Sequence, residues 1–145
     1  MNLTAKALAA MSHIRLKAKI ESLPELFDFM SSQCDGHSVS SKDRLSIMLI
    51  VEELVTNICY YAYPNTEGDF EVDMEFLSDR CLVKITDSGN PFDPTKVQKP
   101  DTTSPLAERK IGGMGLLLVR ENADDFQYER IEDRNIVRIA RRLGR

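Results

Sequence analysis

The sequence predicts an α+β protein: a two-layer α/β sandwich in which helices cover one face of a mixed, mainly antiparallel sheet. Some segments alternate apolar and polar residues, as strands with one buried face do. Others carry apolar residues at helical spacing. The two kinds follow the order strand, helix, helix, strand, strand, loop, helix, strand, strand. The 145 residues suffice for a single domain, which we expect over residues 1–145.

The first half of the chain is expected to hold one strand and two helices. Residues 12–20 alternate and predict a half-buried strand. Ser22 is expected to cap a helix that runs to about residue 33, with Pro24 tolerated in its first turn. A longer helix is expected over residues 41–62, ended by Tyr63 and Pro64. Its apolar positions are Leu45, Met48, Leu49, Val55, Ile58, Cys59 and Ala62.

The second half is expected to hold four strands and one helix. Strands are expected over residues 70–77 and 81–86, and again over 125–131 and 135–142. A helix is expected over residues 116–123. The irregular segment at about 88–110 holds four of the six prolines, and loops this long inside a domain are usually functional.

Composition excludes several classes of function. The net charge of −4 argues against a nucleic-acid-binding protein. The late basic residues form either a solvated edge strand and tail or a binding patch; they are Arg138, Arg141, Arg142 and Arg145. Three cysteines without a CxxC pair fit a reducing, cytoplasmic compartment. His13 and His37 lack partners at metal-ligand spacing, so no zinc site is expected.

No membrane association is expected from the sequence. We find no stretch of about 18 apolar residues, the length that a spanning helix needs. The first twenty residues lack the apolar core of a signal peptide.

Glu53 and Asn57 are the first candidate functional residues. They are four apart, so they share one face of the predicted helix. A carboxylate and an amide at this spacing suit a magnesium–phosphate group and an oriented nucleophile. The alternative is an exposed polar pair on a surface helix. Glu52 is a second candidate glutamate, but only Glu53 has the four-residue offset to Asn57.

Two further features follow. Asp87 ends an apolar strand before a glycine-containing turn. Its side chain therefore either stabilises the turn or is a fixed acceptor for an exocyclic amine such as that of adenine. In the sequence GGMG, residues 112–115, glycines stand directly before a helix. The N–H groups of Gly113 to Leu116 would form an anion site there; the alternative is a flexible hinge.

The order of these features resembles the ATP-binding domain shared by gyrase, Hsp90, histidine kinases and MutL, the Bergerat fold of the GHKL family. EELVTNICYYAYP is similar to its N-box, DSGNPFDP to its first glycine box, and ERKIGGMGLLLV to the end of its ATP lid and its second glycine box. The resemblance covers nearly the whole chain and is closest to the anti-sigma-factor serine kinases.

The resemblance implies roles for individual residues. Asn57 would help to coordinate Mg²⁺ bridging the ATP phosphates, and Glu53 would be the catalytic base. Asp87 would bind the adenine amino group, and Gly89 would let the base lie against the backbone. The phosphates would be bound by the backbone N–H groups of Gly113, Met114, Gly115 and Leu116. The resemblance also implies an ATP lid at about 90–112, from which the side chain of Arg109 would contact the phosphates. The alternative for Arg109 is a solvated arginine in a loop.

Three positions depart from the family pattern. Tyr61 stands where the N-box often has histidine, and Asn90-Pro91 where many relatives have a further glycine. Asn135 stands where a threonine often backs the adenine.

The resemblance leaves two functions open. One is an ATP-dependent serine/threonine kinase that acts as an anti-sigma factor and phosphorylates a small STAS-type anti-anti-sigma protein. The other is a nucleotide-gated switch that binds its partner without transferring phosphate. The expected partners are a sigma factor, a STAS-type protein or both, with possible homodimerisation and no direct contact with nucleic acid.

Overall fold

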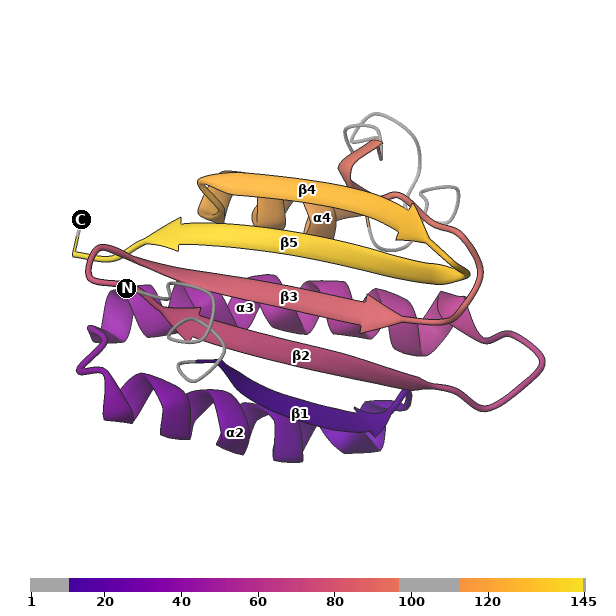
Figure 1. Cartoon of the computed structure of the whole chain (residues 1–145), viewed down its shortest axis with the longest axis horizontal. Helices are drawn as coiled ribbons and strands as arrows, with labels where there is room; N and C mark the ends of the chain where they lie inside the picture. Colours follow the sequence, from indigo (N-terminus) through magenta and orange to yellow (C-terminus); the bar gives the residue numbers. More distant parts are fainter. Residues whose placement is uncertain (1–10, 97–112, 145) are drawn as a thin grey trace, which may run out of the picture.

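A five-stranded sheet carries helices on one face in the computed structural model, which describes residues 11–96 and 113–144 (Figure 1). The strands are β1 (Ser12–Lys17), β2 (Asp69–Phe76), β3 (Arg80–Asp87), β4 (Asp125–Ile131) and β5 (Arg134–Arg142). The helices behind the sheet are α2 (Leu23–Gly36), α3 (Ser41–Asn57) and α4 (Gly113–Asn122). The predicted α+β two-layer sandwich is therefore confirmed.

The strand order is β1-β2-β3-β5-β4, and all four pairings of these strands are antiparallel. The prediction of a mainly antiparallel sheet is right, and no parallel pair joins the described strands. β5 lies between β3 and β4, so the edge-strand interpretation of the late arginines is wrong. Arg141 on this strand is buried and pairs with Asp43 of α3.

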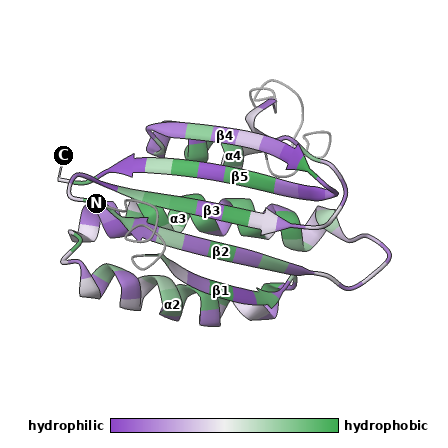
Figure 2. Ribbon diagram, viewed as in Figure 1, coloured by the Kyte–Doolittle hydropathy of each residue, from purple (hydrophilic) through white to green (hydrophobic). Residues whose placement is uncertain are grey.

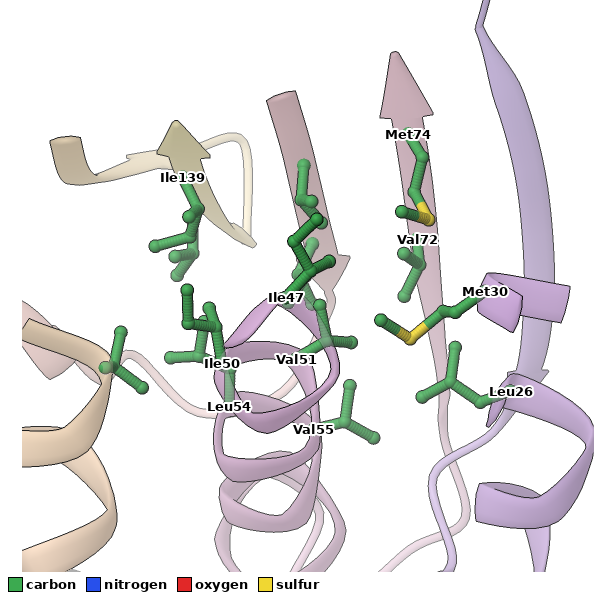
Figure 3. Close-up of a cluster of buried hydrophobic side chains, with 14 of the residues drawn as sticks. Leu26, Met30, Ile47, Ile50, Val51, Leu54, Val55, Val72, Met74 and Ile139 are labelled. Carbon is green, nitrogen blue, oxygen red and sulfur yellow. The ribbon is translucent and has the colours of Figure 1, made fainter. Parts of the chain in front are cut away.

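Alternation along the strands fixes which face is covered. Phe70, Val72 and Met74 of β2 are buried, whereas their neighbours on the strand are partly exposed acidic residues. Figure 2 shows the resulting mixture of hydrophilic and hydrophobic residues along each strand. The inward side chains meet Leu26 and Met30 of α2 in one core, part of which Figure 3 shows. Burial of this apolar area is the main force that joins the two layers.

α3 is the central helix of the covered face. Its buried apolar residues are Ile47, Ile50, Val51, Leu54 and Val55. The predicted stripe was wrong at Leu45, whose side chain is 71% exposed. Because apolar residues lie on nearly all sides of this helix, their positions alone did not identify the side that faces the sheet.

The same helix bears on the membrane prediction. Together with the turn that follows, it gives a helical segment, Ser41–Ala62, that is long and apolar enough to span a membrane. The statement that no stretch reaches that length was therefore wrong. The buried side chains of α3 pack against the sheet, as those of a core helix do, so the segment is weak evidence for a span.

Element boundaries differ from the predictions mainly at helix ends. β1 ends at Lys17, and a 3₁₀ turn (Ile20–Ser22) precedes α2; the Ser22 side chain makes no capping bond. α3 changes into a π-helical turn at Ile58–Ala62. α4 begins at Gly113, three residues earlier than expected. The other four strands agree with the predicted ranges to within one residue.

Candidate functional site

A pocket lies where the end of α3, the end of β3 and the start of β5 meet. Its apolar lining includes Leu54, Ile58, Ala62, Ile85 and Val137, and its polar lining is Asn57, Asp87, Asn90 and Asn135. Asn57 and Asp87, predicted separately from two motifs, therefore face the same pocket. An apolar pocket with a few convergent polar groups is the usual form of a small-molecule site.

Asp87 is the last residue of β3, and it is only 7% exposed. Its Oδ1 accepts hydrogen bonds from the Gly89 backbone N–H at 2.8 Å and from Asn135 Nδ2 at 3.0 Å. Burial raises the pKa of this carboxyl above its ordinary value, although the two hydrogen bonds and nearby Arg130 act in the opposite direction. The structure thus holds Asp87 as a fixed acceptor, as predicted. The bond from the Gly89 N–H also stabilises the turn, so the alternative role applies as well.

Glycine is required at position 89 by its contact with the π-helical turn that follows α3. A Cβ at this position would stand 2.4 Å from the carbonyl oxygen of Ala62, the last residue of the π-helical turn. The same carbonyl accepts the backbone N–H of Asn90 at 2.9 Å. The structure therefore gives its own reason for glycine here: the loop after β3 packs backbone to backbone on the π-helical turn that follows α3. π-helical turns inside helices are frequent at functional sites.

Asn57 and Glu53 lie one turn apart on α3, as their spacing predicts. The Asn57 side chain donates from Nδ2 to the Glu53 carbonyl oxygen at 3.1 Å, and its Oδ1 remains as an acceptor. Mg²⁺ takes oxygen ligands, so this Oδ1 fits a metal ligand. Asn57 is half-buried at the pocket wall, so the alternative of a surface polar pair is wrong for it.

Glu53 contacts the first turn of α4. A Cβ at Gly115 would stand 1.9 Å from Glu53 Oε2, so the carboxylate lies directly on the Gly115 backbone. Burial, and then the neighbouring charge of Glu52, raise the pKa of Glu53. The close approach that the glycine-rich sequence predicted is therefore made, in this structure, by a carboxylate of the protein.

The start of α4 is held in place by its hydrophobic side. Leu116 is 3% exposed and Val119 is fully buried in the core. Because the helix begins at Gly113, the N–H groups of residues 113–116 have no acceptor within the helix. They offer the positive end of the helix dipole beside Glu53.

Other contributors to the site were missed by the sequence analysis. Tyr63 accepts the backbone N–H of Ser88 at 2.8 Å and donates to the Asp69 carbonyl oxygen at 2.7 Å, which ties the loop after β3 to β2. Arg130 donates to the Gly89 carbonyl oxygen at 2.8 Å. Tyr128 donates to Asn135 Oδ1 at 2.6 Å. Alternation along residues 125–131 places Tyr128 and Arg130 on one face, but only the pairing of β4 with β5 brings them next to Asn135 and Gly89.

Two aromatic residues line the pocket and are also exposed to solvent. Tyr61 is 48% exposed and Phe92 is 46% exposed. Arg109 and most of the predicted lid lie outside the described residues, as does the side chain of Met114. Their predicted contacts with phosphate therefore stay predictions.

Comparison with known proteins identifies a family. A family model described as a histidine kinase-like ATPase domain matches residues 16–141. The chain is 28% identical over 99 residues to the serine-protein kinase RsbW of Halalkalibacterium halodurans, covering 66% of this chain and 59% of that protein. It is 26% identical over 92 residues to the serine/threonine-protein kinase BtrW of Bordetella bronchiseptica, covering 63% of this chain and 65% of that protein.

One solved structure shows the same fold. The RsbU and RsbW domains of a Mycobacterium tuberculosis protein match 93% of this chain and 33% of that chain, with a TM-score of 0.68 and 14% identity. The matched regions span less than two thirds of both kinase relatives. The resemblance to the GHKL family and its serine-kinase branch, predicted from the three boxes, is confirmed by these similarities.

Proposed function

The chain belongs to the histidine kinase-like ATPase domain family, and on that premise we propose that it binds Mg·ATP and phosphorylates a serine or threonine of a small STAS-type protein. One observation carries the proposal. Asn57 and Asp87 line one pocket, and Glu53, one turn from Asn57, lies against the first turn of α4. The names of the two kinase relatives support the type of reaction.

The proposed orientation of ATP follows from the chemistry of each end of the site. Asp87 is a buried acceptor in an apolar pocket, which suits the amino group and flat faces of adenine. The N–H groups at the start of α4, which have no acceptor within the helix, suit phosphate oxygens, and Arg109 would add positive charge from the lid. Asn57 lies between the two ends, where its Oδ1 would hold Mg²⁺ against the phosphates.

Glu53 is the proposed catalytic base. Its raised pKa makes it a better proton acceptor than an ordinary carboxylate, and its contact with Gly115 places it beside the proposed phosphate site. Phosphoryl transfer depends mainly on positioning and charge neutralisation, so the proposed base, the magnesium ligand and the phosphate contacts are the groups that the protein has to supply. The magnesium would supply the neutralising charge when bound.

The proposed partners come from the family resemblance of the sequence motifs. As an anti-sigma regulator, the protein would act in the cytoplasm and bind a sigma factor. A STAS-type anti-anti-sigma protein would release the sigma factor from it, and the kinase would phosphorylate that STAS-type protein. The first test is transfer of labelled phosphate from ATP to that protein. We expect transfer by the natural chain. ATP binding without transfer to any serine or threonine would instead establish the nucleotide-gated switch and disprove the kinase.

Replacing the base separates binding from chemistry. Glu53→Gln keeps the shape of the side chain but removes its proton acceptor, so we expect unchanged Mg·ATP affinity and a loss of transfer of at least about 100-fold. Glu52→Gln, the neighbouring glutamate, is the matched control and should keep transfer. Transfer by Glu53→Gln at the natural rate would remove Glu53 from the mechanism.

Replacing the magnesium ligand tests the cation site. Asn57→Ala removes Oδ1, and we expect calorimetry to detect no Mg·ATP binding under conditions in which the natural chain binds. ATP affinity measured in EDTA should differ much less between the two proteins, because that affinity does not use the cation. Equal Mg·ATP affinities would show that Asn57 does not hold the metal.

A further inference from the structure

Asn135 is a buried amide whose hydrogen-bonding groups are all used within the protein. Its side chain is on the inner face of β5, and the residue is 4% exposed. Nδ2 donates to Asp87 Oδ1 at 3.0 Å and to the Asn90 carbonyl oxygen at 2.8 Å. Oδ1 accepts from the Tyr128 hydroxyl at 2.6 Å and from the Phe92 N–H at 3.4 Å. An asparagine side chain has two donor hydrogens and two acceptor sites, so none remains for a ligand.

The Asp87 carboxylate, the Asn90 carbonyl and the Phe92 N–H fix the orientation of this amide. Tyr128 and the Phe92 N–H are both donors on one side of Asn135, whereas Asp87 Oδ1 and the Asn90 carbonyl are both acceptors on the other. A flipped amide would place its oxygen against these two acceptors and its NH₂ against the Phe92 N–H. The Tyr128 hydroxyl can donate or accept and so adapts to either orientation. The network therefore accepts only one orientation, in which NH₂ faces Asp87.

The consequence for Asp87 is that its two oxygens differ. Oδ1 accepts from Asn135 and from the Gly89 N–H. Within residues 11–96 and 113–144, no hydrogen bond reaches Oδ2. Asp87 lines the pocket, so Oδ2 is the oxygen left for a ligand.

We propose that Asn135, supported by a hydrogen bond from Tyr128, is a positioning residue that makes Asp87 a single acceptor and so selects adenine over guanine. Adenine presents one exocyclic amine beside a ring acceptor, and one carboxylate oxygen satisfies that amine. Guanine presents two adjacent donors, N1–H and N2–H, which pair with both oxygens of a carboxylate. With Oδ1 occupied, guanine would bury one donor without a partner, which lowers affinity. This inference rests on the proposed nucleotide function and adds a residue that determines its base specificity.

A pH dependence follows from the same geometry. Oδ1 faces two donors, so a proton adds to Oδ2 and turns the free acceptor into a donor. The charged and titratable groups around Asp87 are Arg130 of β4 and Tyr63 after α3. Burial raises the pKa of Asp87, and the Asn135 bond opposes this rise. Loss of the bond would raise the pKa further, so adenine binding would fail at a higher pH than in the natural chain.

The test measures dissociation constants of Mg·ADP and Mg·GDP for the natural chain, Asn135→Ala and Tyr128→Phe. Gln127→Ala, on the exposed face of β4 beside Tyr128, is the matched control. We expect the ratio of the GDP constant to the ADP constant to fall about tenfold in Asn135→Ala, the equivalent of one hydrogen bond to a charged group. It should fall about threefold in Tyr128→Phe and stay unchanged in Gln127→Ala.

The second measurement is the pH below which ADP binding is lost, which we call the acid limb. This pH should be higher in Asn135→Ala than in the natural chain. If Asn135→Ala does not fold, Tyr128→Phe carries the test alone, because it removes one hydroxyl only. An unchanged GDP-to-ADP ratio and acid limb in the folded variants would overturn this inference, even where both nucleotides bind more weakly. Failure of the natural chain to bind either nucleotide would overturn the proposed function and this inference with it.

Discussion

At the scale of single residues, the site depends on two glycines as well as on its polar side chains. Gly115 leaves space for the Glu53 carboxylate, and Gly89 leaves space for the Ala62 carbonyl. The glycine-rich motif predicted that something approaches the backbone here. It did not predict that a glutamate from another helix does so, because that contact depends on how α3 packs against α4.

Adding one carbon at Gly115 tests the position of the base. The new Cβ of Gly115→Ala meets the end of a flexible side chain, so Glu53 moves at little cost in stability, and alanine favours the helix by up to about 1 kcal/mol. We expect an unchanged or higher melting temperature together with phosphotransfer reduced about 100-fold, because misplacing a reacting group by about 1 Å has that effect.

The control for this prediction is Gly36→Ala. A Cβ at Gly36 meets nothing within 4 Å, so this variant should keep both stability and transfer. Transfer by Gly115→Ala at the natural rate would mean that the observed position of Glu53 is unrelated to catalysis.

At the scale of elements, the sequence predicted the strands well and the helix ends poorly. Alternation with a period of two marks a strand wherever one face is buried, and β2 shows this clearly. Helix ends depend on tertiary contacts. The π-helical turn at Ile58–Ala62 follows no local signal that we identified, and it is stabilised in part by the loop that packs on the Ala62 carbonyl.

A buried ion pair joins three elements at the end of the molecule. Arg141 of β5 donates to Asp43 of α3 at 3.2 Å and to the Asn122 carbonyl at the end of α4 at 2.8 Å. Burial alone would raise the pKa of Asp43, but hydrogen bonds from the Gly144 N–H, Ser40 and Arg141 outweigh it, and the pKa is lowered. The pair was not predictable from sequence, since its members are 98 residues apart.

Asp43→Asn is expected to lower the free energy of unfolding by about 3 kcal/mol at pH 7, because the Arg141 charge remains buried without its partner. The folded pKa of Asp43 is lowered, so its contribution is fully present above the unfolded value of about 3.9 and is lost as pH falls through the folded pKa. Urea unfolding at pH 7 and at lower pH should therefore show the difference from the natural chain shrinking with acid.

The exposed pair of Glu129 and Arg138 provides the control. Glu129→Gln should change the free energy of unfolding by less than about 1 kcal/mol. A loss in Asp43→Asn no larger than in this control would contradict a structural role for the buried pair.

At the scale of the whole molecule, the order of elements was predictable but the order of strands in space was not. Local patterns identify strands, whereas the place of β5 between β3 and β4 is set by long-range pairing. For the same reason the sequence identified Asp87 and Asn57 but missed Tyr128 and Arg130, which reach Asn135 and Gly89 only because β4 pairs with β5.

Homodimerisation is a prediction that belongs to this scale and comes from the family resemblance. Light scattering should give twice the mass of one chain at micromolar concentration. A single-chain mass over that range would contradict it without affecting the nucleotide site.

We expect one bound nucleotide to connect Asp87, Asn57 and the start of α4. The most direct measurement is a crystal structure with magnesium and a non-hydrolysable ATP analogue. We predict the adenine amine within hydrogen-bonding distance of Asp87 Oδ2, the metal on Asn57 Oδ1, and phosphate oxygens on the N–H groups of residues 113–116. An analogue bound elsewhere, or a pocket filled by protein side chains at saturating analogue, would contradict the account.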